Sequence, residues 1–154
     1  MDGHQIWMFE CAKIGFDAKP RRYKEGTKTS EDAARQLQCD VSNIAKSIVF
    51  VGENAPIVVI TSGSNRVDRK KKLKKILGYK PGQATPEYIF QNTGYKVGGV
   101  PPFGHLKETI KIIDEDLFRY DIIWGAGGTA DTVFPVSPEK LKEISKAEIR
   151  NVKQ

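Results

Sequence analysis

The stretch Ile44-Ala45-Lys46-Ser47-Ile48-Val49-Phe50-Val51 is rich in β-branched residues and predicts a strand. Side chains alternate between the two faces of a strand, and in this stretch both faces are mostly apolar. Such a strand is expected in the interior of a sheet. Gly52-Glu53-Asn54 then predicts a turn into a second strand over residues 56–61, so the two strands are expected to form a hairpin.

Helical and strand patterns are interspersed over the rest of the chain. Capping residues predict the starts of three helices, at Thr29 or Ser30, at Thr85 and at Ser137. A fourth helix is expected over residues 67–77, and residues 19–28 predict a loop or an edge strand. Short runs typical of strands cover residues 109–113, 120–124 and 132–136. This mixture favours an α+β fold with a mixed sheet, in a single domain over residues 1–154.

Composition places the chain among ordinary globular proteins. Hydrophobic residues make up 39% of the 154 residues and charged residues 29%, which argues against a disordered chain. No apolar run approaches the roughly 20 residues that span a bilayer, and no secretory signal is recognisable, so no membrane partner is expected. Cys11 and Cys39 are too few for a disulfide scaffold. They predict reduced thiols and a cytoplasmic location.

The net charge of +6 is concentrated in one segment. Between Arg66 and Lys80 lie eight basic residues and one acid, Asp68. A cluster of this kind is typical of proteins that contact phosphates. A solvated helix face is the commoner interpretation of a lysine run, and a nuclear-localisation patch is a third one.

Lys46 is the most informative residue of the central stretch. It shares a face with Ile44, Ile48 and Phe50, where burying an ammonium group is costly unless it finds partners or reaches a cleft. The residue therefore indicates either a functional site beside the strand or a lysine that extends to solvent near the strand end. The pattern alone does not separate these two interpretations.

The loop Gly98-Gly99-Val100-Pro101-Pro102-Phe103-Gly104 is the second signal. Glycines let a backbone approach a ligand closely, and prolines restrict the loop's conformations. Such a loop can direct N–H groups at an anion or a developing oxyanion, although a structural turn is the commoner use of glycine and proline. His105 follows this loop, so it is expected either in the same cleft or at the surface.

Other catalytic signatures are missing or incomplete. Residues 125–130 match the G-x-G-x-x-A dinucleotide fingerprint, but a strand and not a helix is predicted to follow, which excludes a Rossmann site. No His, Cys and acidic residues have the spacing of a zinc site, and no nucleophile elbow is present. We therefore expect no metal, no other cofactor and no protein nucleophile.

Taken in order, the motifs resemble the YbaK/EbsC family, the free-standing relatives of the editing domain of bacterial prolyl-tRNA synthetase. The resemblance covers about residues 27–146 and leaves residues 1–26 unassigned. It rests on the helix start at Thr29, the lysine strand, residues 94–104, the acidic turn at residues 114–117, the glycine-rich residues 125–128 and the closing helix. It implies a mixed, strongly curved, barrel-like sheet flanked by helices.

The resemblance also implies trans-editing, the hydrolysis of an amino acid wrongly esterified to tRNA. Backbone groups would position a water that the substrate helps to activate at the acceptor end, with tRNA-Pro carrying a small amino acid as the expected substrate and an aminoacyl-tRNA synthetase as a further partner. The catalytic candidates are Lys46, Gly98, Gly99 and Pro102. The substrate-binding candidates are Ser47, Val100, His105, Gly127 and Asp131. The tRNA-binding candidates are Arg66, Arg69, Lys70, Lys71, Lys72, Lys74 and Lys75.

One departure from the family leaves the amino-acid selectivity open. Some relatives carry a histidine after the glycine-rich turn, where this chain has Asp131 nearby. Two other functions also fit the motifs: a non-catalytic tRNA- or RNA-binding module that uses residues 66–75, and a small-molecule binder that uses the glycine-lined cleft. Only the deacylase predicts turnover of a charged tRNA, and only the small-molecule binder predicts independence from the basic segment.

Overall fold

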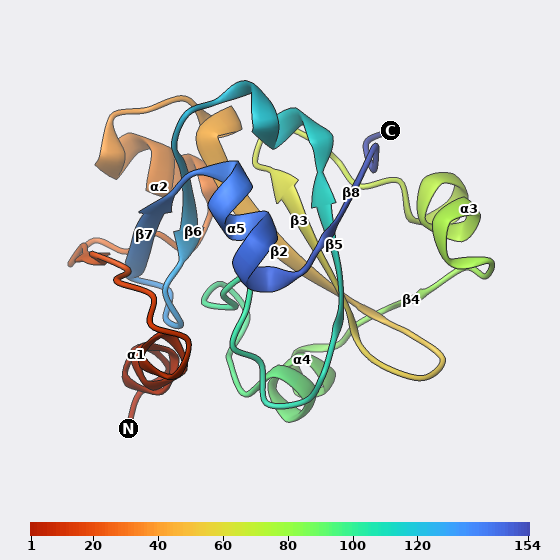
Figure 1. Cartoon of the computed structure of the whole chain (residues 1–154), viewed down its shortest axis with the longest axis horizontal. Coiled ribbons are helices and arrows are strands. Elements are labelled where there is room, and N and C mark those ends of the chain that lie inside the picture. The colour runs from red at the N-terminus through yellow and green to blue at the C-terminus, as the bar shows by residue number, and fades with distance from the viewer.

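Eight strands form one mixed sheet in the computed structural model, which describes all residues from Met1 to Gln154 (Figure 1). The strands are β1 (Arg21–Arg22), β2 (Ile44–Val51), β3 (Ile57–Ser62), β4 (Gly82–Gln83), β5 (Ile110–Asp114), β6 (Ile123–Ala126), β7 (Thr132–Val136) and β8 (Glu148–Arg150). Their order is β1-β7-β6-β2-β3-β5-β8, and β4 pairs with β2 outside this path. The mixed α+β sheet is confirmed, but it is open and not closed into a barrel, because β1 and β8 end the path.

The predicted hairpin is confirmed at the centre of this sheet. β2 and β3 pair antiparallel from Ala45–Ser62 to Phe50–Ile57. β6 runs parallel to β2, and β5 runs parallel to β3. Strands from the C-terminal half therefore pair with both sides of the hairpin, although β6 pairs with β2 only at Ile44 and Ala45.

Helices cover the two faces of the sheet. The helices are α1 (Gly3–Lys13), α2 (Ser30–Leu37), α3 (Lys74–Leu77), α4 (Pro86–Thr93) and α5 (Pro138–Ser145), with short turns η1 (Val41–Asn43), η2 (Arg69–Leu73) and η3 (Glu115–Arg119). The side chains of Ala45 and Val49 share a core with α1 and α5, and we call this side the α5 face. Those of Ile48 and Phe50 point to the opposite side, where η2 and α3 pack around Leu73; we call this the α3 face. α2 packs on the α3 face near Ile44.

Local sequence explains where the helices begin. The side chains of Thr29, Thr85 and Ser137 each accept a hydrogen bond from a backbone N–H in the first turn, at 3.0–3.1 Å, which confirms all three predicted caps. α4 ends at Gly94, whose φ of 85° lies in the left-handed region that favours glycine. The predicted helix over residues 67–77 is shorter and divided, because η2 is a π-helical turn that precedes the four residues of α3.

The N-terminal segment contains a helix that the sequence patterns did not predict. In α1 the side chain of Trp7 is fully buried, and its ring lies 4.5 Å from that of Phe134 and 5.5 Å from that of Phe103. Apolar residues occur on both sides of α1, with Phe9 59% exposed, so no amphipathic pattern marks it. α1 nevertheless belongs to the main core through Trp7.

Two further observations concern the expectations from composition. Cys11 and Cys39 are both free thiols, and burial raises the pKa of Cys11 to about 12. None of the helices has the length and apolar character needed to cross a membrane.

Candidate functional site

A cavity of about 660 Å³ opens along β2. Its size falls within the range of about 300–1,000 Å³ that is usual for ligand pockets. The cavity has 23 lining residues, of which 13 are hydrophobic. They come from β2, from the segment that leads into α2, from β6, and from the loop after α4. It is therefore a mostly apolar pocket built by segments that are far apart in the sequence, from Thr27 to Val133.

The cavity lies at a gap in the pairing of β2. β6 pairs only with Ile44 and Ala45, and β4 pairs only with Phe50 and Val51. Residues 46–49 consequently have a strand partner on the β3 side alone. A stretch of backbone in the middle of a sheet is thus left open to a ligand.

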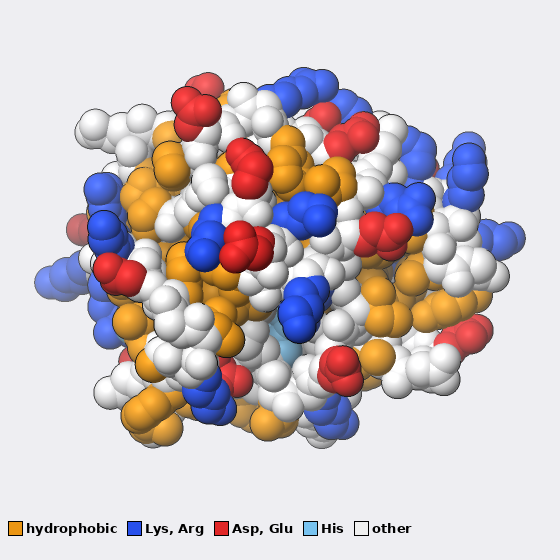
Figure 2. Space-filling model, in the orientation of Figure 1, with side chains coloured by type: hydrophobic (Ala, Val, Ile, Leu, Met, Phe, Trp, Pro, Cys, Tyr) orange, Lys and Arg blue, Asp and Glu red, His pale blue; other side chains and the backbone are white.

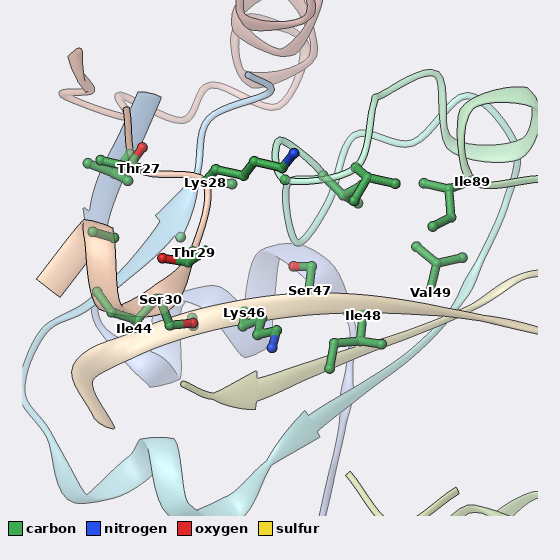
Figure 3. A pocket seen from close by; sticks show the side chains of 18 of the residues that line it. Thr27, Lys28, Thr29, Ser30, Ile44, Lys46, Ser47, Ile48, Val49 and Ile89 are labelled. Atoms are coloured by element: carbon green, nitrogen blue, oxygen red, sulfur yellow. The ribbon is translucent and has the colours of Figure 1, made fainter. Parts of the chain in front are cut away.

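Ser47 points from this gap into the cavity, towards the loop that follows α4 (Figure 3). Its Oγ is buried and has no hydrogen-bond partner. An unsatisfied buried hydroxyl costs about 1–3 kcal/mol, so such groups are uncommon in folded proteins unless a ligand or water satisfies them. Ser47 therefore has the property expected of a ligand-binding group.

Lys46 also lines the cavity, and its environment combines the two interpretations that the sequence left open. Its side chain is exposed, and Figure 3 shows the ammonium group on the side of β2 opposite to Ser47. The α3 face is covered by α2 at one end and by η2–α3 at the other, and Lys46 lies between these two coverings. The ammonium group reaches solvent at the cavity, so it does not carry the cost of a buried charge.

The predicted glycine loop divides into cavity and scaffold residues. Gly98 and Val100 line the cavity, whereas Gly99 and Pro102 do not. Gly98 has a φ of 90°, and a Cβ there would lie 2.6 Å from Cγ of Lys28, which also lines the cavity. A Cβ on Gly99 would lie 2.7 Å from Cα of Thr129, so this glycine permits close packing of two loops and does not approach a ligand.

His105 supports the same loop from outside the cavity. Its Nε2 donates to the carbonyl oxygen of Pro101 at 2.8 Å, and its Nδ1 accepts from the hydroxyl of Thr109 at 3.0 Å. Burial lowers the pKa of His105 to about 4, so the ring is neutral near pH 7. The structure therefore places His105 as a brace for the Pro101 turn, away from the expected substrate position.

Gly127 and Asp131 likewise lie outside the cavity. The carbonyl oxygen of Gly127 accepts from Nδ1 of His4 at 2.6 Å, so the start of α1 packs on the glycine-rich turn. Asp131 forms an ion pair with Arg22 at 3.2 Å and accepts from the hydroxyl of Thr129 at 2.6 Å. Both residues connect the N-terminal segment to the β6–β7 turn.

The basic cluster contains structural and free side chains. Arg69 donates to the carbonyl oxygen of Pro81 at 2.9 Å, and Lys72 donates to that of Lys153 at 3.1 Å. Among the seven tRNA-binding candidates of the cluster, the exposed ones are Arg66, Lys70, Lys71, Lys74 and Lys75. Figure 2 shows Lys and Arg side chains at the margin where α3 lies, with further basic side chains at the opposite margin. Lys and Arg side chains also lie at the top and bottom of this view and near its centre, so the cluster is one of several groups of basic side chains on this face.

Some cavity residues had no recognisable signal in the sequence. Lys28 was hidden in a stretch that reads as a polar loop, and Glu31 reads as an ordinary first-turn acid of α2. Trp124 lines the cavity and carries the guanidinium group of Arg21 at 4.9 Å from its ring centre. These three residues belong to different elements of the fold, and only the tertiary structure brings them together at the cavity.

An open mixed sheet with a ligand-sized cavity at its central strand defines a small α+β binding or catalytic domain. The family model of the aminoacyl-tRNA editing domain matches residues 24–144 of this chain. The chain belongs to the aminoacyl-tRNA editing domain family, which confirms the YbaK/EbsC resemblance seen in its motifs.

Individual relatives agree with this assignment. The chain is similar to EbsC of Enterococcus faecalis, a candidate Cys-tRNA(Pro)/Cys-tRNA(Cys) deacylase, with 23% identity over 146 residues that cover 94% of this chain and 89% of EbsC. It is 30% identical over 125 residues to proline–tRNA ligase of Thermosipho melanesiensis, a match covering 79% of this chain and 22% of the ligase. The crystal structure of a candidate trans-editing enzyme for prolyl-tRNA synthetase has a TM-score of 0.94, 34% identity, and coverage of 100% of this chain and 98% of that one.

Proposed function

We propose that this protein hydrolyses the ester bond of wrongly charged aminoacyl-tRNA, and that its substrate is tRNA-Pro carrying a small amino acid. The observation that carries this proposal is the cavity at the β2 gap in a chain of the editing-domain family. Its largely apolar lining suits a small side chain. The similarity to EbsC and to part of a proline–tRNA ligase supports the choice of tRNA.

The loop after α4 supplies candidate groups for the chemical step. The N–H groups of Gly98 and Val100 donate to no other protein group, and both residues line the cavity. When water adds to the ester carbonyl carbon, negative charge develops on the carbonyl oxygen, and fixed N–H donors stabilise it. The tetrahedral intermediate then releases the ribose oxygen, which takes up the proton that the water has lost.

No protein nucleophile is needed in this scheme. The ester of an aminoacyl-tRNA is already activated, so positioning the water and stabilising the oxyanion lower the barrier substantially. The free ribose hydroxyl beside the ester is well placed to orient and activate the water. The neutral ring of His105 is engaged with Pro101 and Thr109 and so contributes through the loop and not as a base.

Lys46 and the basic cluster have roles in binding the tRNA. The exposed ammonium group of Lys46 lies at the cavity on the α3 face, where it can hold a phosphate or another polar group of the acceptor end. The exposed basic residues of η2–α3 lie on the same side of the sheet. Contacts to the acceptor-stem backbone require charge but no base recognition, which fits flexible lysines.

The proposal is tested by measuring deacylation of tRNA-Pro charged with alanine, cysteine, serine or threonine. At least one of these substrates should be hydrolysed well above its spontaneous rate, while correctly charged prolyl-tRNA is spared. Binding of the same tRNAs without hydrolysis would contradict the proposal. That outcome would favour the alternative, a non-catalytic RNA-binding module, which the five exposed basic residues also support.

A further inference from the structure

The free edge of β2 has a defined set of unpaired backbone groups. The N–H of Gly63 donates to the carbonyl oxygen of Ile44 at 2.8 Å, so the Ile44 carbonyl points towards β3. Backbone groups of successive strand residues point to alternate edges, and therefore those of Lys46 and Ile48 also point towards β3. The N–H and C=O groups of Ser47 and Val49 point the other way, into the gap.

No neighbouring strand is registered against Ser47 on this edge, whereas the Val49 carbonyl oxygen faces β4 next to the Phe50–Gln83 pair. Neither residue takes part in a backbone hydrogen bond outside the sheet, nor in one with a side chain. β6 ends its pairing at Ala45 and β4 begins its pairing at Phe50. Buried backbone donors and acceptors are almost always paired, so a gap of this kind inside a cavity indicates a ligand that completes it.

The length of the gap limits what can complete it. Four strand residues span roughly 13 Å at about 3.3 Å per residue, and both ends are closed by strands. A peptide that adds a strand would need a longer open edge, since strands commonly have about 5–6 residues. A single extended aminoacyl group fits, because its α-ammonium N–H and its ester carbonyl point to the same side, as in one residue of a strand.

We propose that the aminoacyl group of the substrate binds as a one-residue extension of the sheet at Ser47, an inference that rests on the proposed deacylase function. Its α-ammonium group donates to the carbonyl oxygen of Ser47, and its ester carbonyl accepts from the Ser47 N–H. Ser47 is chosen over Val49 because its unpartnered Oγ points to the loop that carries Gly98 and Val100. The ester carbonyl then receives N–H donors from the strand and from the loop.

This mode of binding separates recognition from selectivity. The two backbone bonds are the same for every amino acid, so they hold any aminoacyl group in position. Discrimination falls to the apolar walls, where Val49, Ile89 and Val100 restrict the side chain. The proposal thus explains how an editing site can accept more than one small amino acid and still exclude larger ones.

The test replaces single backbone N–H groups by oxygen, using α-hydroxy acids at position 47 or 49. The two changes perturb the β2–β3 pairing alike, because in each the preceding carbonyl, of Lys46 or Ile48, faces β3. They differ only in which free N–H is lost. The probe is an acceptor-stem RNA that ends in 3′-alanylamino-3′-deoxyadenosine, whose amide bond resists hydrolysis.

The protein with a backbone ester at position 47 should bind this RNA about tenfold more weakly than the unmodified protein. The protein with a backbone ester at position 49 should lose less than threefold in affinity. The proposal is overturned if the protein with the backbone ester at position 47 binds the RNA as tightly as the unmodified protein. It is also overturned if the backbone ester at position 49 causes the larger loss of affinity. Deacylation by the unmodified protein is measured in parallel. If the unmodified protein deacylates tRNA and the backbone ester at position 47 leaves RNA affinity unchanged, only this inference is refuted. If the unmodified protein does not deacylate tRNA, both the proposed function and this inference are refuted.

Discussion

Ser47 is a candidate binding residue because its hydroxyl has no hydrogen-bond partner in the protein. Its hydroxyl is buried beside a cavity and has no partner, whereas the buried hydroxyls of Thr61 and Ser145 are hydrogen-bonded. A polar group left unsatisfied in the free protein lowers stability, and a ligand recovers that loss on binding. Stability and activity should therefore respond in opposite directions when this hydroxyl is removed.

We expect Ser47→Ala to leave the free energy of unfolding unchanged or to raise it by up to about 1 kcal/mol, while deacylation falls several-fold. Urea unfolding and deacylation assays on the same preparation measure both effects. Ser145→Ala is the matched control, because its Oγ donates to the Leu141 carbonyl at 2.6 Å and its loss should reduce stability. A Ser47→Ala protein that is less stable and fully active would contradict a ligand-binding role.

Lys46 is exposed at the cavity, so its removal should affect the substrate and not the fold. Lys46→Ala should reduce kcat/KM for deacylation by about 10- to 100-fold, the usual value of a hydrogen bond to a charged group. The melting temperature should stay within a degree or two. Lys142→Ala, on the exposed side of α5, is the control and should change neither quantity. If Lys46→Ala keeps full deacylation activity, Lys46 does not contribute to substrate binding.

His105 makes stability depend on pH. Burial lowers its pKa from 6.5 to about 4, so between these values the unfolded chain binds more protons than the folded one. Stability from this residue is present above pH 6.5 and is lost as the pH falls towards 4. The loss should be on the order of 2–3 kcal/mol.

Urea unfolding at pH 7, 5.5 and 4 measures this loss. His105→Gln keeps a donor for the Pro101 carbonyl but has no proton to gain. It should be less dependent on pH over this range than the unmodified protein. If both proteins lose the same stability between pH 7 and 4, the effect belongs to other groups.

At the scale of elements, the loop after α4 combines two functions in adjacent residues. Gly98 faces the cavity and Lys28, whereas Gly99 faces Thr129, and its N–H donates to the Lys96 carbonyl at 3.0 Å. Alternate residues of one loop thus serve the site and the scaffold. The glycine pair alone does not show which residue has which role.

The variant Gly99→Ala should lower stability by about 1–3 kcal/mol, because its Cβ would overlap the backbone of Thr129. Turnover by the folded fraction should remain near normal. The comparison variant Gly98→Ala places a Cβ at a positive φ and against Lys28, so it should reduce turnover as well. Thermal melts and single-turnover deacylation distinguish the two. If Gly99→Ala has a normal melting temperature but no longer deacylates tRNA, Gly99 would act in the catalytic site and not in the scaffold.

At the scale of the whole molecule, the α3 face joins the cavity to the basic cluster. Lys46 lies between the α2 and η2–α3 coverings, and the exposed lysines extend from there along η2 and α3. An acceptor stem lying over this face would reach the cavity with its end and the lysines with its backbone. Arg69 and Lys72 hold loops together and are less suited to this role.

Replacing Lys70, Lys71, Lys74 and Lys75 by Glu should weaken tRNA binding strongly at low salt and leave turnover at saturating substrate nearly unchanged. Phosphate contacts position the tRNA without reacting, and their contribution falls as salt rises. Affinity measured at several salt concentrations should give a smaller salt slope for the variant. As a control, Lys140 and Lys142 on α5 are replaced in the same way. An equal loss in both variants would indicate a general charge effect and no specific surface.

Signals within a few residues of one another were sufficient for much of the secondary structure. The caps at Thr29, Thr85 and Ser137 depend on hydrogen bonds inside a single turn, and the β2–β3 hairpin depends on two apolar runs and a short connection. α1 and β8 were missed because their order comes from distant contacts. Trp7 is held by Phe103 and Phe134, and β8 is held by β5.

The sequence by itself determined the family and the α+β class, and it singled out the Lys46 strand and the Gly98 loop as candidates for the site, since these are carried by residue order. Only the tertiary structure decided which of those residues meet. It places Gly98, Val100, Ser47 and Lys46 around one cavity and leaves Gly99, Pro102, His105, Gly127 and Asp131 outside it. The gap between β6 and β4 was equally invisible, because strand pairing is set by elements about 30 to 80 residues away. Backbone groups become a binding site only where the surrounding fold leaves them unpaired.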